Sequence, residues 1–314
     1  MMLSFKASLR LTLLASAIFL VACQPKADPK DSQEQQKPAV KEQKPVELTL
    51  KGETVPSKVA LPDCDGKTCP DFTVERLQSN FLFIDKIVDQ QILKTLDQIL
   101  EIAEPDTKVK QPDQKTEASG VAGAEQKNSF DAQVQRYANS FISLDNELKA
   151  LSSSHQINLL VKPKILQAQG KVVTVVLNSS SYLGGAHGSA AQHYYNFDLK
   201  EQKQIKLEDL LRPQQKAALE RLAHEAFKTW VTDSKLADNV ADYEQAWPFK
   251  LSDNFLLGEQ GLILQYGEYE IGPYVVGLPR LVIPYDQLQE VLKKKYLPQP
   301  KVQPASAPVA KSGS

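Results

Sequence analysis

An imidazole stands in a glycine-rich stretch of the sequence. His187 follows Gly184 and Gly185 and precedes Gly188. Because glycine has no Cβ, such a run permits a tight chain reversal with positive φ. A histidine at the tip of this reversal could act as a ligand or as a general base. Its ring could also hydrogen-bond the backbone of its own turn, and this structural role is the favoured one.

The other histidines of the chain raise the question of a metal site that includes His187. A protein zinc site needs three or four ligands at workable spacing. His193 lies six residues from His187 across the turn, whereas His155 and His224 lie in other predicted elements. The spacing does not favour a metal site, and we expect no metal and no cofactor.

A second candidate for chemistry is the carboxylate pair Glu268 and Glu270. Glycosidases use two carboxylates, and residues two apart lie on one face of a regular strand. However, a single loop supplies both, and no further motif predicts an opposing wall of a cleft. The sequence also lacks the Gly-x-Ser-x-Gly motif of serine hydrolases. We therefore predict that the protein is not an enzyme.

The loop around these carboxylates is better suited to contact than to catalysis. Tyr269, Pro273 and Tyr274 stand between glycines, and large rings on short loops are typical of binding surfaces. The alternative is that Tyr274 and Val276 pack under a sheet as core. We expect a ligand-binding surface formed by Tyr182, His187, Glu268, Tyr269, Pro273 and Tyr274.

Two amphipathic helices are predicted ahead of these segments. Apolar residues recur at helical spacing over 85–103 and again from Phe130 to Leu151. Asn128 is a suitable N-cap for the second helix, with Asp131 in its first turn. Both helices should pack their apolar faces on the sheet. The apolar positions of the second helix could also form a short coiled coil, but packing in a globular domain is favoured for an isolated segment of this length.

The period changes to two after the second helix. Ile157–Val161 and Val172–Leu177 predict a hairpin that turns at Gln169-Gly170, and a third strand follows over 193–199. Pro213 is expected to open a further helix. Later strands are predicted at 255–257, 262–266 and 281–283, before a closing helix from Tyr285 to Leu292. The predicted fold class is α+β, an antiparallel β-sheet with helices packed on it.

The N-terminus predicts export and lipidation. Lys6 and Arg10 precede an apolar run from Leu11 to Val21, which is typical of a signal peptide. The run ends in Leu20-Val21-Ala22-Cys23, which resembles the lipobox of bacterial lipoproteins. We expect cleavage before Cys23 and acylation of its thiol, which would hold the protein on a membrane. An uncleaved short anchor is the alternative.

The residue after Cys23 bears on localisation. Gln24 is not Asp, and in a cell with two membranes the lipoprotein resemblance implies the outer membrane, facing the periplasm. In a cell with one membrane the protein would lie on the outer face of that membrane.

The remaining cysteines and the charge fit an extracytoplasmic protein. Cys64 and Cys69 are predicted to form a disulfide, which would stabilise the fold by only about 2 kcal/mol because the loop is short. A redox or zinc-binding pair is the alternative, which the spacing and the lack of a second cysteine pair disfavour. The net charge is −1, from 37 basic and 38 acidic residues. This balance gives no basic patch of the kind that binds nucleic acid.

Four motifs follow one another in the second half of the chain. They are Tyr182-Leu183-Gly184-Gly185-Ala186-His187, Tyr194-Tyr195-Asn196-Phe197-Asp198-Leu199, Leu207-Glu208-Asp209-Leu210 and Tyr269-Glu270-Ile271-Gly272-Pro273-Tyr274-Val275-Val276-Gly277. In this order they resemble one known family, the extracytoplasmic domain of the RsiV anti-sigma factors. The resemblance covers about residues 156–296 and implies an α+β domain that recognises lysozyme. Residues 46–155 are similar, more weakly, to the small domain that precedes it there and in PdaC-type deacetylases.

The predicted organisation follows from these observations. Lys-, Gln- and Pro-rich composition predicts that 23–49, 105–127 and 297–314 have no packed structure. The predicted parts are a signal peptide over 1–22, a lipidated tether over 23–49, a small helical or α+β domain over 50–155 with a mobile loop over 105–127, an RsiV-type domain over 156–296, and a tail over 297–314.

The expected function is that of a membrane-anchored, non-catalytic binding module of the cell envelope. The ligand is a lysozyme-like protein or peptidoglycan. Because no cytoplasmic segment or transmembrane helix is expected, sequestration of a sigma factor is not expected. Two alternatives stay open, an enzyme or enzyme accessory acting on wall glycan and a structural lipoprotein of an envelope complex.

Overall fold

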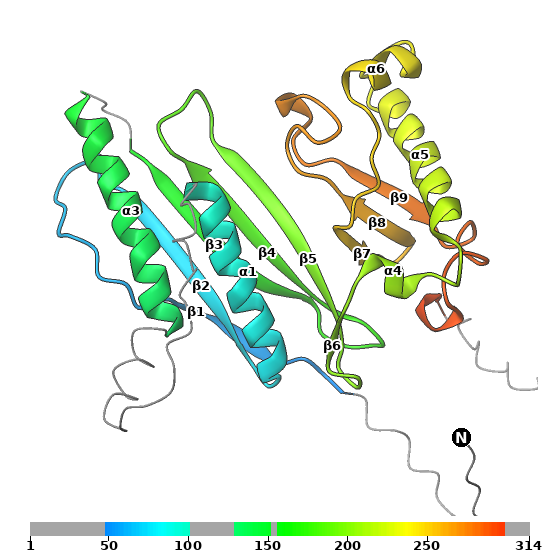
Figure 1. Ribbon diagram of the computed structural model, residues 1–314, viewed down its shortest axis with the longest axis horizontal. Coiled ribbons are helices and arrows are strands. Elements are labelled where there is room, and N and C mark those ends of the chain that lie inside the picture. The colour runs from blue at the N-terminus through cyan, green and yellow to red at the C-terminus, as the bar shows by residue number, and fades with distance from the viewer. Residues whose placement is uncertain (1–47, 101–128, 152–155, 299–314) are drawn as a thin grey trace, which may run out of the picture. The chain divides into compact units, whose positions relative to one another are not determined.

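The computed structural model describes residues 48–100, 129–151 and 156–298 (Figure 1). A six-stranded sheet has the order β1-β2-β3-β4-β5-β6, and a three-stranded sheet has the order β7-β8-β9. The strands are β1 (Gly52–Pro56), β2 (Asp71–Ser79), β3 (Asn158–Gln167), β4 (Val173–Tyr182), β5 (Ser189–Asp198), β6 (Lys203–Ile205), β7 (Phe255–Leu257), β8 (Gly261–Gln265) and β9 (Arg280–Pro284).

Helices cover these sheets. They are α1 (Leu82–Leu100), α3 (Phe130–Ala150), α4 (Leu207–Leu210), α5 (Lys216–Asp233) and α6 (Val240–Ala246), with 3-10 turns η1 (Tyr274–Val276) and η2 (Lys294–Tyr296). The predicted α+β class is confirmed. One pair of strands departs from the antiparallel prediction, because β2 and β3 are parallel. The chain passes through α1 and α3 between them, as a parallel pair requires a long crossover connection.

The apolar stripe of α1 explains how this helix packs. Ile84, Val88, Ile92 and Leu96 are all fully buried and recur every four residues. They share one core with Phe141 of α3 and with the inward residues of β2, β3 and β4. Figure 1 shows α1 and α3 lying across one face of the six-stranded sheet. A second core joins α5 to the three-stranded sheet, with Phe227 and Val231 fully buried against it.

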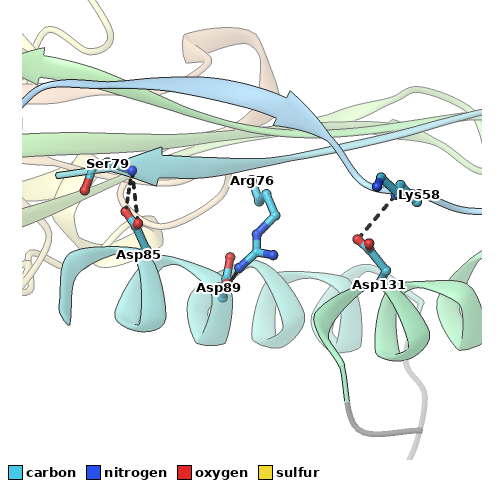
Figure 2. Close-up of polar contacts among 6 residues, drawn as sticks. All are labelled: Lys58, Arg76, Ser79, Asp85, Asp89 and Asp131. Atoms are coloured by element: carbon cyan, nitrogen blue, oxygen red, sulfur yellow. Dashed lines mark hydrogen bonds and ion pairs between the residues drawn. The ribbon is translucent and has the colours of Figure 1, made fainter. Parts of the chain in front are cut away.

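Polar contacts fasten β2 and its neighbours to the helices (Figure 2). The carboxylate of Asp85, in the first turn of α1, accepts hydrogen bonds of 3.0 and 3.1 Å from the backbone N–H of Ser79. Arg76 of β2 and Asp89 of α1 form an ion pair. Asp131 of α3 accepts a hydrogen bond from the backbone N–H of Lys58. These contacts set the start of α1 and α3 against the sheet.

Asn254 joins the two sheets. Its side-chain oxygen accepts a 2.8 Å hydrogen bond from the backbone N–H of Tyr194, and its side-chain nitrogen donates to the carbonyl oxygen of Gln192 at 2.7 Å. The amide thereby takes the place of a neighbouring strand along the part of β5 that lies beyond its pairing with β6. A few residues along β5, Asn196 donates to the carbonyl oxygen of Phe255 at 2.7 Å.

Several sequence predictions need correction. The N-cap of α3 is Ser129, whose side chain accepts from Ala132 N, and Asn128 lies outside the described residues. Pro213 does not open a helix, because α5 begins at Lys216 after the N-cap Gln215. The strands β1 and β2 were not predicted.

The predicted closing helix was wrong. Residues 285–291 form successive turns, and Leu292 forms an antiparallel β-bridge with Leu211. Their backbone pairs instead with the segment before α5, since Arg212 N donates to Val291 O and Lys293 N donates to Leu210 O. The apolar residues that suggested a helix, Leu288 and Leu292, are fully buried.

Other predictions hold or remain untested. The hairpin and the later strands are present, and Cys64 is disulfide-bonded to Cys69. The six-stranded sheet takes strands from both sides of the predicted boundary at 155/156, and the division into two domains stays a prediction. Cys23 and the segments 105–127 and 299–314 lie outside the described residues. Among the helices that the structure describes, none has the length and apolar character needed to cross a bilayer.

Candidate functional site

Two turns from different sheets meet at the candidate site. One is the turn over 183–188 that joins β4 to β5, and the other is the loop over 266–279 between β8 and β9. Gly184 has a φ of +86°, which a side chain rarely adopts. A Cβ on Gly188 would lie 2.9 Å from the carbonyl oxygen of Ser181. Glycine is therefore needed at both positions for the chain to turn back as β5.

Glu268 holds the two turns together. Its carboxylate accepts a 2.9 Å hydrogen bond from Ser189 Oγ and a 3.0 Å hydrogen bond from Ala190 N. Charge-assisted hydrogen bonds of this kind are stronger than neutral ones. The start of β5 and the β8–β9 loop are thus fixed to each other by one side chain.

His187 lies within a cluster of rings, the aromatic stack of His187, Tyr269 and Tyr274. The imidazole stacks on Tyr274 with ring centroids 4.0 Å apart and an interplanar angle of 22°. The centroids of Tyr269 and Tyr274 are 5.9 Å apart, and those of His187 and Tyr269 are 6.2 Å apart. The two turns therefore build one aromatic surface.

Hydrogen bonds orient every ring of the stack. His187 Nδ1 lies 3.0 Å from Gly188 O, and since a carbonyl oxygen only accepts, Nδ1 carries the proton. In the neutral imidazole Nε2 then accepts from the Tyr269 hydroxyl at 3.0 Å. Tyr274 donates from its own hydroxyl to Gly188 O at 3.0 Å. The expected bond from His187 to the backbone of its own turn is present.

The rings remain open to solvent. Tyr269 is 50% exposed and Tyr274 is 37% exposed, while the neighbouring Val275 is 87% exposed. This exposure disagrees with the alternative in which Tyr274 packs under a sheet. Tyr269 also has a φ of +61°, an uncommon conformation for a bulky residue. The carboxylates of Glu268 and Glu270, on either side of Tyr269, accept hydrogen bonds that hold the loop in this shape.

The carboxylates of Glu268 and Glu270 bind different parts of the chain. Glu270 accepts a 2.7 Å hydrogen bond from Gly267 N and pairs with Lys250 at 2.9 Å. It closes its own loop, whereas Glu268 reaches β5. Both carboxylates are engaged in holding backbone, an arrangement unlike the pair of free carboxylates that glycosidases present to a sugar.

The remaining predicted site residues flank the stack. Pro273 is the N-cap of η1 and precedes Tyr274 directly. Tyr182 is the last residue of β4 and is half-buried at the entrance to the turn. The structure thus brings His187, Glu268, Tyr269 and Tyr274 together and places Pro273 and Tyr182 beside them. Their role in binding stays a prediction.

A hollow of about 540 Å³, which the sequence did not predict, lies next to the stack. Such a volume falls within the usual range for small-molecule sites, roughly 300–1,000 Å³. The signal that could have indicated it is the run of small residues on β4 and β5. Its lining includes Thr95, Gln98, Ser179, Ser181, His187 and His193.

His193 contributes an imidazole to this hollow. The ring is accessible to solvent within the hollow. Partial desolvation by the surrounding protein lowers its pKa, and the charge of Lys94 acts in the same direction while Glu270 acts against both. A neutral imidazole can accept or donate a hydrogen bond. Among the described residues, no group of three or more His, Cys, Asp or Glu side chains is arranged to hold a metal ion.

Comparison with known proteins identifies relatives of this chain. Residues 208–286 match a family described as "Protein of unknown function (DUF3298)". The chain is also 24% identical over 178 residues to the peptidoglycan-N-acetylmuramic acid deacetylase PdaC of Bacillus subtilis (strain 168). That alignment covers 55% of this chain and only 38% of PdaC.

Solved structures show the same fold. A DUF3298 family protein from Pseudomonas aeruginosa PAO1 is 25% identical with a TM-score of 0.54, covering 81% of this chain and 98% of that one. A DUF3298 member from Bacteroides fragilis NCTC 9343 is 18% identical with a TM-score of 0.53, covering 79% and 94%. The DUF3298 match contains the β8–β9 loop, and the turn around His187 precedes it. The chain therefore has the fold of DUF3298 proteins and matches that family over residues 208–286.

Proposed function

We propose that the protein is an extracytoplasmic cell-envelope protein whose described part is a non-catalytic binding module for a lysozyme-like protein or for peptidoglycan. The observation that carries this proposal is the exposed aromatic stack of His187, Tyr269 and Tyr274, held in place by Glu268. Rings that are already ordered lose little conformational entropy when a partner binds. The distant relationship to PdaC, named for its action on peptidoglycan, supports a ligand of the cell wall.

The neighbouring side chains make the stack suited to a protein partner. Val275, at 87% exposure, adds apolar area beside Tyr274. Exposed aromatic and aliphatic groups that are rigidly held are typical of the residues that dominate binding energy in protein interfaces. Glu268 and Glu270, on either side of Tyr269 in the sequence, are engaged with backbone and with Lys250.

Binding of the purified protein to immobilised lysozyme and to isolated sacculi, at two salt concentrations, tests the proposal. The mature chain carrying Cys23→Ser avoids lipidation and is otherwise complete. The double variant Tyr269→Ala/Tyr274→Ala should weaken binding by about 2–4 kcal/mol if these rings are anchors. Leu160→Ala/Leu166→Ala, which removes side chains of similar exposure on β3, is the matched control.

Two outcomes would count against the proposal. Absence of binding to both lysozyme and sacculi would remove it. Equal affinity in the Tyr269→Ala/Tyr274→Ala variant and the control, with both proteins folded, would show that binding occurs elsewhere.

Attachment to a membrane through acyl chains on Cys23 is part of the same proposal. The lipobox-like Leu20-Val21-Ala22-Cys23 supports it. Mass spectrometry of the N-terminal peptide from membranes should find a processed, acylated cysteine, and Cys23→Ser should abolish both the acylation and the processing at this site. Recovery of an unprocessed chain from Met1 would contradict it.

A second candidate is an enzyme acting on wall glycan. His193 favours it, because an imidazole of lowered pKa stands with serine hydroxyls in a hollow and such groups can transfer protons. Incubation of the protein with sacculi, followed by assays for released acetate and reducing ends, tests it. Turnover that His193→Gln abolishes would favour this candidate over the binding module.

A further inference from the structure

The hollow arises because one face of the six-stranded sheet changes from large apolar residues to small polar ones. Val173, Val175 and Leu177 of β4 are buried beneath the helices. Alternate residues of a strand share a face, so Ser179 and Ser181 continue that face. Their side chains are too small to fill the space that the preceding residues fill.

The neighbouring strand changes in the same way. Ser179 pairs with Ala191, Ser181 pairs with Ser189, and Leu177 pairs with His193. Paired residues of antiparallel strands lie on the same face. Both strands therefore present small side chains at one end of the sheet, with the His193 imidazole at the inner boundary.

The last turns of α1 form a polar wall above this surface. Gln91, Thr95 and Gln98 recur at helical spacing beside the buried apolar stripe. The Gln91 side chain accepts from the hydroxyl of Tyr195 on β5 at 3.3 Å, so this stripe faces β5. Thr95 and Gln98 line the hollow farther along the helix.

The lining has a consistent chemistry. Hydroxyl, amide and imidazole groups alternate with small apolar surfaces from residues such as Ile99 and Leu183. Among the described residues that line the hollow, none is Asp, Glu, Lys or Arg. A charged ligand would therefore lose water without meeting a side chain of opposite charge in the lining, which is costly. The charges that reach His193 from outside the lining, on Glu270 and Lys94, are of opposite sign.

We propose that this hollow is a binding site for a neutral, hydroxyl-rich ligand of the saccharide class. Sugars carry hydroxyls that donate and accept, as serine and threonine hydroxyls do, and apolar C–H surfaces that suit Ile99 and Leu183. His187 lies in both the hollow lining and the aromatic stack. The inference therefore adds a class of ligand, bound next to the aromatic stack, to the proposed function. It rests on the proposed function for the role of this binding in the cell.

Titration of the non-lipidated mature chain with three trisaccharides at pH 8 tests the site. The probes are the neutral N-acetylglucosamine trimer, the N,N,N-trimethylglucosamine trimer, whose quaternary amines are cationic at any pH, and the anionic galacturonic acid trimer. We expect the neutral trimer to bind with a Kd on the order of 1 mM or tighter and each charged trimer to bind about tenfold more weakly. Amide resonances of Ser179, Ser181 and Ala191 should shift on binding.

Ala191→Phe is designed to fill the hollow with a ring. It should weaken binding of the neutral trimer about tenfold or more. Ala217→Phe, on the exposed face of α5 and outside the hollow, is the matched control and should bind normally. Thr95→Val keeps the shape of the side chain but removes its hydroxyl, and it should weaken binding of the neutral trimer without abolishing it. This variant tests the site if Ala191→Phe does not fold.

The outcomes separate this inference from the proposed function. Trimer binding that persists in Tyr269→Ala/Tyr274→Ala, or in a protein that binds neither lysozyme nor sacculi, supports the hollow site alone. Absence of trimer binding, equal binding of all three trimers, or binding unaffected by Ala191→Phe would overturn the inference, even if lysozyme binds.

Discussion

Glu268 and Ser189 lie 79 residues apart in the sequence, yet the carboxylate of one accepts a 2.9 Å hydrogen bond from the hydroxyl of the other. The same carboxylate accepts from the backbone N–H of Ala190. Ser189 begins β5, and Glu268 begins the aromatic part of the β8–β9 loop. This contact therefore determines how His187 on one turn meets Tyr269 and Tyr274 on the other.

Glu268→Ala should loosen the aromatic stack. It removes both acceptors and leaves the Ala190 N–H without its partner, at a cost of about 1–2 kcal/mol in the free energy of unfolding. Affinity for lysozyme or sacculi should fall as well, because the rings would have to be ordered on binding. Urea unfolding and the binding assay measure the two effects.

Glu268→Gln and Glu259→Ala are the controls for this change. Gln retains one acceptor oxygen and should keep most of the stability, whereas Glu259 is exposed in the turn between β7 and β8. If Glu259→Ala proved as damaging as Glu268→Ala, the contact to Ser189 and Ala190 would not be the cause.

The backbone conformation at Tyr269 predicts an unusual order of stability among variants at this position. With a φ of +61°, this position disfavours most side chains, and Asn tolerates the conformation better than Ala. Both substitutions remove the ring and its hydrogen bond to His187. Tyr269→Asn should therefore be more stable than Tyr269→Ala by about 0.5–1 kcal/mol, while both bind weakly. Thermal unfolding of the pair decides this, and an Ala variant at least as stable as the Asn variant would contradict it.

The ion pair between Arg76 and Asp89 should show strong coupling (Figure 2). The side chains are 29% and 15% exposed, and the Arg76 guanidinium also lies 4.7 Å from the ring centroid of Phe130. Arg76→Met alone leaves a largely buried carboxylate without its partner and should cost about 2–3 kcal/mol, less than for a fully buried pair. The double variant Arg76→Met/Asp89→Leu should cost less than the single one, as measured by urea unfolding.

The deficit of Arg76→Met should also depend on pH. Burial raises the pKa of Asp89 above its ordinary value of 3.8, although Arg76 opposes this. A raised pKa in the folded state means that the folded protein binds more protons than the unfolded one. Stability of the variant should therefore fall as the pH rises above that value, and a deficit independent of pH would contradict this account.

His193 predicts a second pH dependence with the opposite sign. Desolvation lowers its pKa below the ordinary value of 6.5, with Lys94 adding to the shift and Glu270 opposing it. The unfolded state then binds more protons between the two pKa values, so this contribution to stability is present above pH 6.5 and is lost as the pH falls below it. His193→Gln should flatten the pH profile of unfolding between about pH 5 and 8. An unchanged profile would contradict the prediction.

Local patterns in the sequence predicted much of the fold. The four-residue recurrence of Ile84, Val88, Ile92 and Leu96 predicted α1, and alternation over 157–177 predicted the β3–β4 hairpin. Both patterns can be recognised within one segment, because side chains repeat every 3.6 residues along a helix and every 2 residues along a strand. The glycines around His187 likewise predicted the turn that joins β4 to β5.

The sequence did not predict, or predicted wrongly, the elements whose secondary structure depends on pairing with segments far away in the chain. Residues 285–292 have the apolar spacing of a helix, but their backbone pairs with Leu210 and Arg212 and forms turns and a β-bridge. The edge strand β1 depends on pairing with β2, and β2 lies beside β3 only because the chain crosses through two helices. The residue pattern of a single segment gives little indication of such pairing.

The sequence by itself determined which side chains the candidate site contains, because the glycines and tyrosines of both turns are local signals. Only the tertiary structure decided that these turns meet, that Glu268 fastens one to the other and that His187 stacks on Tyr274. The hollow beside them was likewise a tertiary outcome. Small residues on β4 and β5 leave space only because a polar stripe of α1 lies above them, and that packing joins segments about 80–100 residues apart.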